Sequence, residues 1–97
     1  MRIRVVGSPN VIPELNANET KVHMTFRPSS RDIFQLVDFC PKLELIQMPK
    51  SYCVTLSKSI KMFLDMQKIE VVVGDVWGHR TDIDVYAELP DEEKKEN

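Results

Sequence analysis

The stretch DIFQLVDFCPKLELIQMP, from Asp32 to Pro49, decides the fold because it holds two hydrophobic periods in succession. Its first half repeats apolar residues at the spacing of one helix face: Ile33, Leu36, Val37 and Cys40. Pro41 cannot continue that helix. The run from Leu43 to Met48 is rich in apolar and branched side chains and ends at a proline, which is typical of a strand. The stretch therefore predicts a helix followed at once by a strand.

The same alternation extends in both directions from this stretch. Three other short apolar runs, each closed by a glycine or proline, are expected to be strands: Ile3–Val6, Lys21–Phe26 and Glu70–Val73. A short helix is expected between Asn10 and Thr20, and a long one from Ser51 to about Gln67. A βαβαβαβ order normally gives parallel strands with right-handed crossovers. We therefore predict an α/β fold: a four-stranded, mainly parallel sheet with flanking helices, in a flavodoxin- or Rossmann-like layout.

The C-terminal part has two interpretations. Thr81-Asp82-Ile83-Asp84 resembles a capping box, which favours a short helix over the residues that follow. The apolar residues from Ile83 to Leu89 also alternate, as in an edge strand. We favour the helix, and we expect residues 1–89 to form one domain and residues 90–97 to be a disordered acidic tail.

Composition excludes several classes of protein. Hydrophobic residues make up 42% of the 97 residues and charged residues 29%, as in a globular chain. No apolar run approaches the roughly 18 residues of a membrane span, so we expect no membrane insertion and a soluble, cytoplasmic protein. Basic residues are spread along the chain and aromatic residues are few, which disfavours binding to nucleic acid. Cys40 and Cys53 have no histidines at ligand spacing, so neither a metal site nor a cofactor is expected.

The segments that follow the strands hold the candidate site. In parallel sheets, ligands bind beyond the carboxyl ends of the strands, where the strand order reverses. Helix N-termini at that edge favour anions. We expect a phosphate, nucleotide or carboxylate to be bound there without catalysis, with Trp77 as an apolar wall. The candidate residues are Arg27, Ser29, Ser30, Lys50, Ser51, Trp77, His79 and Arg80.

Purely structural roles are open for the same residues. Ser29 with Asp32 fits a helix cap, and a carboxylate at that position would repel an anion. Arg27 and Arg31 would form ion pairs with acidic residues such as Asp75. Trp77 would cover part of the hydrophobic core.

An enzymatic alternative uses a thiol. Cys53 would lie in the first turn of the long helix, where the helix terminus and Lys50 would depress its pKa. His79, oriented by Asp75, would act as its base. Any small α/β protein with a cysteine fits this pattern, so it is unspecific.

A third alternative is a homo-oligomeric interaction module, such as a homodimer. Several apolar and aromatic residues exceed the needs of one small core: His23, Met24, Tyr52, Met62 and Tyr86. The first part of the chain has an excess of basic residues and the last part an excess of acidic residues, so the two parts are expected to attract each other within one fold or between subunits. Residues 1–68 hold ten basic and six acidic groups, and residues 69–97 hold three basic and nine acidic groups.

The chain resembles a small uncharacterised family of archaeal proteins of unknown function, found in methane-producing archaea. The resemblance covers residues 1–89 and is carried by five motifs: Phe26-Arg27-Pro28-Ser29, Cys40-Pro41-Lys42-Leu43, Ile46-Gln47, Ser51-Tyr52 and Gly74-Asp75-Val76-Trp77-Gly78-His79-Arg80. It implies an archaeal cytoplasmic source. Residues 36–47 are also similar to part of the non-nucleotide domain of 2-hydroxyacid dehydrogenases, which supports a flavodoxin-like layout. The glycine fingerprint of those enzymes is absent from the sequence, so no hydride chemistry is implied.

Overall fold

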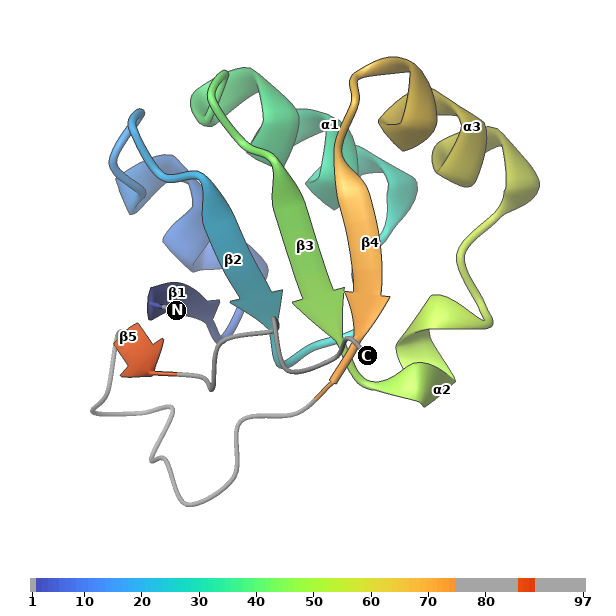
Figure 1. Ribbon diagram of the computed structural model, residues 1–97, viewed down its shortest axis with the longest axis horizontal. Coiled ribbons are helices and arrows are strands. Elements are labelled where there is room, and N and C mark those ends of the chain that lie inside the picture. The colour runs from blue at the N-terminus through green and yellow to red at the C-terminus, as the bar shows by residue number, and fades with distance from the viewer. Residues whose placement is uncertain (1, 75–85, 89–97) are drawn as a thin grey trace, which may run out of the picture.

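A parallel sheet forms the centre of the molecule. The computed structural model describes residues 2–74 and 86–88. Four strands run the same way side by side: β1 (Arg2–Val6), β2 (Lys21–Met24), β3 (Leu45–Met48) and β4 (Glu70–Val73) (Figure 1). A fifth strand, β5 (Tyr86–Glu88), adds antiparallel to β1, which gives the order β4-β3-β2-β1-β5. The predicted α/β fold with four parallel strands is confirmed.

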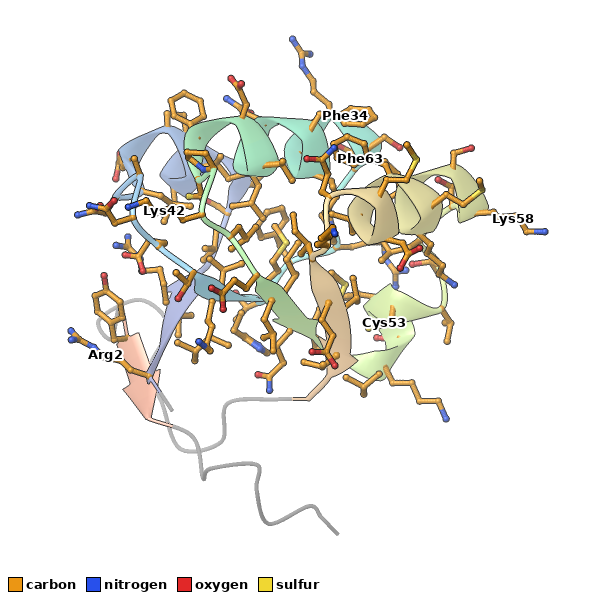
Figure 2. All side chains as sticks on the ribbon, turned by 45° about the horizontal axis from the view of Figure 1, so that its top comes forward. Arg2, Phe34, Lys42, Cys53, Lys58 and Phe63 are labelled. Atoms are coloured by element: carbon orange, nitrogen blue, oxygen red, sulfur yellow. The ribbon has the colours of Figure 1, made fainter. Side chains whose placement is uncertain are left out.

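The helical connections lie on one face of this sheet. They are η1 (Pro9–Glu14, a 3-10 helix), α1 (Ser30–Phe39), α2 (Lys50–Cys53) and α3 (Lys58–Met66). Each parallel strand is added beside the preceding one in the same direction, and right-handed crossovers then leave their helices on the same side. In Figure 2, η1, α1 and α3 all lie above the sheet.

The main core lies between this face and the helices. In-register pairing aligns Val22 with Ile46 and Ile46 with Val71, so that these side chains form one row across the sheet. The expected apolar stripe of α1 packs onto such rows, and α3 does the same through Ile60 and Leu64. The fully or almost fully buried members of this core include Val6, Ile12, Val22, Met24, Ile33, Leu36, Cys40, Ile46, Met48 and Leu64.

The opposite face of the sheet carries a second, smaller buried cluster. Ile3 and Val5 are its buried members, and Leu45 packs against them. The His23 and Gln47 side chains lie in the same row as Val5 and are joined by a hydrogen bond of 2.7 Å between Nδ1 and Oε1. His23 and Met24, which we expected to be surplus to the core, are both buried.

The strand order bears on the candidate site. In parallel sheets, ligands commonly bind where the order reverses and a crevice opens between neighbouring strands. The four parallel strands instead follow their order in the chain. The short connections step one strand at a time in the same direction, so the described sheet has no reversal and no crevice of that kind.

The long helix predicted from Ser51 to Gln67 is wrong. The segment forms two helices, of four residues in α2 and nine in α3. Ser57 accounts for the break, because its hydroxyl accepts a hydrogen bond of 3.1 Å from the Ile60 backbone N–H and so starts a new helix. Thr55 adds to it, since its hydroxyl donates to the carbonyl of Tyr52 at 2.9 Å.

The helix favoured near the C-terminus is also wrong where the structure describes it. Residues 86–88 form β5, in which Ala87 pairs with Ile3 and Tyr86 with Arg4. Strand β1 would otherwise end the sheet with an unpaired backbone edge, and the alternating apolar pattern supplies a partner for it. Residues 81–85, which include the expected capping box, lie outside the described residues, as does the expected tail from residue 90 to residue 97.

The end of α3 fixes the direction in which β4 begins. The Lys68 N–H donates to the Asp65 carbonyl at 3.0 Å, and the Ile69 N–H donates to the Leu64 carbonyl at 2.9 Å. These two bonds form a Schellman motif. The motif requires a left-handed residue, and Lys68 adopts it with φ of 62°. The chain then turns directly into β4.

Candidate functional site

Arg27 is a cation with defined contacts at the carboxyl edge of the sheet. It follows β2, and its Nη1 donates to the Ser51 carbonyl at 3.2 Å and to the Thr55 hydroxyl. Its guanidinium carbon lies 4.9 Å from the centroid of the Tyr52 ring, which is a cation–π distance. The side chain is exposed, and no carboxylate of the described residues lies within ion-pair distance of it. These contacts orient a guanidinium while leaving it accessible to solvent.

Ser29 serves as the N-cap of α1. Its hydroxyl accepts from the Asp32 backbone N–H at 3.1 Å, and the Asp32 carboxylate accepts from the Ser29 backbone N–H at 2.9 Å. This reciprocal pair is a complete capping box. The structural alternative is therefore confirmed for Ser29. The carboxylate already occupies the positive end of α1, so that helix terminus offers no place to an external anion.

The remaining candidates divide into two groups. Ser30 begins α1, and Lys50 and Ser51 lie at the start of α2; all three are exposed. Of these, the structure brings Ser51 to Arg27 through its backbone carbonyl. Four residues named from the sequence lie outside the described residues: Asp75, Trp77, His79 and Arg80.

Two contributors to the site were missed in the sequence. Tyr52 and Thr55 hold the Arg27 guanidinium in place, although neither was expected at an anion site. Thr55 follows Ser51 by four residues, and residues at this spacing in a helical segment lie on the same side. This spacing is the one sequence signal that placed Thr55 near Ser51.

The environment of Cys53 opposes an activated thiol. Cys53 is the last residue of α2, which is a single turn of four residues and not the start of a long helix. Burial raises the pKa of its thiol above the ordinary value, and the Lys61 charge lowers it by less. The Sγ atom lies 3.6 Å from the Met48 carbonyl oxygen, toward which the thiol donates. The expectation of a depressed pKa at Cys53 is therefore wrong.

A groove of about 440 Å³ lies beside β4, between this strand and the helices α2 and α3. Its walls are mainly apolar, with a thiol and three charged groups: Cys53, Val54, Leu56, Lys61, Leu64, Asp65, Ile69, Glu70, Val71 and Val73. Sequence analysis missed this groove because it exists only where the predicted long helix is broken.

A polar cluster lies at the opposite edge of the molecule, around β5. The Tyr86 hydroxyl donates to the Glu19 carboxylate, and this hydrogen bond is the main reason why the pKa of Tyr86 is raised. The Arg2 guanidinium lies 4.0 Å from the centroid of the same ring. Tyr86 thus joins β5 to the loop before β2. In these contacts, Tyr86 has a structural role.

Among residues 2–74 and 86–88, no three His, Cys, Asp or Glu side chains gather in a way that would hold a metal ion. In the same part of the chain, no helix has the length and apolar character needed to cross a membrane.

Comparisons with known proteins identify a family. No curated protein and no solved structure matches this chain. A match is found with the N-terminal domain of a family of unknown function, DUF1699, over residues 2–85. That range contains all four parallel strands and the helical face described above. The chain therefore belongs to the DUF1699 family, as a representative of its N-terminal domain.

Proposed function

We propose that the protein is a non-catalytic binding module for a small anionic ligand at the carboxyl edge of its parallel sheet. The class of ligand is a phosphate, a nucleotide phosphate or a carboxylate. Arg27 is the central residue of this proposal, and Lys50 supplies a second positive charge from the start of α2. The proposal also includes Ser30 and Ser51, together with Trp77, His79 and Arg80 from outside the described residues.

The fixed guanidinium of Arg27 is the observation that carries the proposal. A guanidinium has five N–H donors in a rigid plane, which suits two oxygens of a carboxylate or phosphate. Both described hydrogen bonds of Arg27 use Nη1. Within the described residues, Nε and Nη2 have no acceptor. The Tyr52 ring and the two oxygens on α2 and its following turn limit the motion of the side chain, which reduces the entropy lost on binding.

The experiment is a titration of the wild-type protein with phosphate, sulfate and common nucleotides. Melting temperature and Trp77 fluorescence provide two independent signals. We expect Arg27→Gln to weaken binding by roughly tenfold, as for the loss of one charge-assisted contact. Lys42→Gln removes the same charge at an exposed position before β3, at the other end of the sheet, and should leave binding unchanged.

Two outcomes would refute the proposal. One is that no anion shifts either signal. The other is that Arg27→Gln and Lys42→Gln weaken binding equally, because the effect would then report net charge rather than a site.

Self-association is a second candidate function, and exposed apolar side chains support it. Six large apolar side chains of the described residues are between 39% and 74% exposed: Phe34, Phe39, Val54, Met62, Met66 and Val73. A chain of 97 residues gains stability when a second copy covers such groups. In this alternative, the protein is a homodimer. The motif resemblance implies an archaeal cytoplasm as its source.

A further inference from the structure

We propose that β4 pairs with β4 of a second copy, antiparallel, so that the two sheets join into one. This inference rests on the proposed self-association and assigns it a surface. The surface, which we call the β4 edge, consists of Glu70–Val73, the exposed Val54 and the groove between β4 and the helices α2 and α3. In Figure 1, β4 is the outer strand at one side of the parallel sheet, with α2 and α3 beside it.

The backbone of β4 offers unpaired groups to a partner. The Glu70 N–H donates to the Glu44 carbonyl and the Gly74 N–H to the Met48 carbonyl, so these residues face β3. Backbone groups of neighbouring residues in a strand point to opposite sides. Val71 and Val73 therefore present their N–H and C=O groups to the outer edge, where the described residues supply no further strand.

The side chains of the edge lack the features that normally prevent pairing. Edge strands of monomeric proteins are commonly protected by lysine, proline or a bulge. The β4 sequence Glu-Val-Val-Val has none of these and carries its one charge at the first residue. Val73 is 60% exposed and Val54 64% exposed, beside the apolar walls of the groove. Covering these side chains would be favourable for a partner that also pairs with the backbone.

The charges of the groove favour a second copy as that partner. Lys61 lies near the α2 end, where its charge acts on Cys53. Asp65 is one turn farther along α3, and Glu70 begins β4 at the other end of the groove. A two-fold axis perpendicular to the sheet reverses the direction of the second groove. The basic end of one copy then faces the acidic end of the other, which is the complementarity required of an isologous interface.

The alternation of side chains fixes the register of this pairing. Residues directly opposite each other in an antiparallel pair share one face, so that Val71 faces Val73 of the second copy and Val72 faces Val72. In this register, the outward N–H and C=O groups of Val71 and Val73 bond across the axis. Glu70 of one copy lies opposite Gly74 of the other, so that the Glu70 carboxylates of the two copies are far from each other.

The first experiment measures mass by sedimentation or light scattering from micromolar to near-millimolar protein. We expect a wild-type dimer. Val73→Lys should raise the dimer dissociation constant by about tenfold or more, because it places a protecting charge at the edge. Gln67→Lys is the matched control: it places the same charge at an exposed residue at the end of α3 that does not line the groove, so it should leave the constant unchanged. Circular dichroism verifies that both variants fold.

A cross-linking experiment tests the register independently of any mutation that adds charge. In a Cys53→Ala background, Val72→Cys should form an intermolecular disulfide on mild oxidation, since non-hydrogen-bonded antiparallel partners have Cα atoms about 4.5 Å apart. Glu70→Cys lies on the same face of the same strand but far from its counterpart, and should not link.

The outcomes separate the two proposals. A wild-type monomer throughout the concentration range would overturn both self-association and the β4 edge. A dimer that Val73→Lys weakens no more than Gln67→Lys does, or equal linking of the two cysteine variants, would overturn the β4 edge while self-association stands.

Discussion

Replacement of Ser29 by alanine separates a capping role from a ligand role at the residue where both were open. The hydroxyl accepts the Asp32 backbone N–H at 3.1 Å, one of the first N–H groups of α1 that have no partner within the helix. We expect Ser29→Ala to lower the free energy of unfolding by about 1 kcal/mol, with a range of roughly 0.5–2 kcal/mol for such caps. For a domain of this size, that corresponds to a fall of about 4–8 °C in melting temperature.

Ser30 provides a matched control one residue away. It is exposed at the first position of α1, and alanine has the higher helix propensity there. Ser30→Ala should therefore leave stability unchanged or raise it slightly. Urea unfolding followed by circular dichroism measures both variants, and equal slopes against urea concentration would show that the unfolded state is unaffected. Equal losses of stability in the two variants, or none in Ser29→Ala, would refute the capping argument.

Three further predictions concern single residues. Lys68→Gly should raise the free energy of unfolding by about 0.5–1 kcal/mol in urea unfolding, because glycine adopts the left-handed φ of 62° without strain; a loss of stability would contradict this. Alkylation of Cys53 by iodoacetamide should be slow at neutral pH and still rise above about pH 9, because burial raises the pKa of this thiol; a rate that levels off below neutral pH would restore the thiol mechanism. The raised pKa of Tyr86 means that its contribution to stability is complete below about pH 10 and is lost as pH rises through the folded-state pKa. The difference in melting temperature between wild type and Tyr86→Phe should therefore shrink above about pH 10, and a constant difference would argue against this assignment.

The parallel sheet was predictable because its signals are local. Each parallel strand is a short apolar run with a proline or glycine close after it, and α1 has apolar residues at helical spacing up to the stop at Pro41. These patterns determine which residues are buried, and the buried rows of the sheet are made of them. Parallel pairing then follows from the length of the connections.

The errors lie where two local patterns compete. The spacing from Leu56 to Leu64 fits one long helix, but the Ser57 hydroxyl caps a new one within it. The sequence of residues 86–88 fits either a helix or a strand. These residues form a strand because they pair with the edge of β1 that would otherwise be unpaired. That edge is created by the strand order, which is a property of the whole sheet and not of the segment. A segment read in isolation does not contain this information.

The sequence placed several polar residues at one edge of the sheet but did not assign the contacts among them. Parallel strands place Arg27 and the start of α2 at the same edge, where Arg27 donates to the Ser51 carbonyl. The role of Ser29 depends on whether its hydroxyl is already used within α1, which only the three-dimensional arrangement decides. The Tyr52 ring lies beside the Arg27 guanidinium, a contact that the sequence did not indicate.

The strand order also determines how an anion would be held. A reversal of order would have provided a crevice that excludes water from the ligand. Here the four parallel strands follow chain order, and the capping box of α1 removes the contribution of that helix terminus. Among the described residues, an anion at this edge would therefore depend on Arg27 and Lys50, both of which are exposed to solvent. Attraction between exposed charges is screened by salt over about 10 Å at 0.1 M ionic strength. Binding at the proposed site should accordingly weaken steeply as neutral salt is added, whereas an enclosed site would retain its affinity.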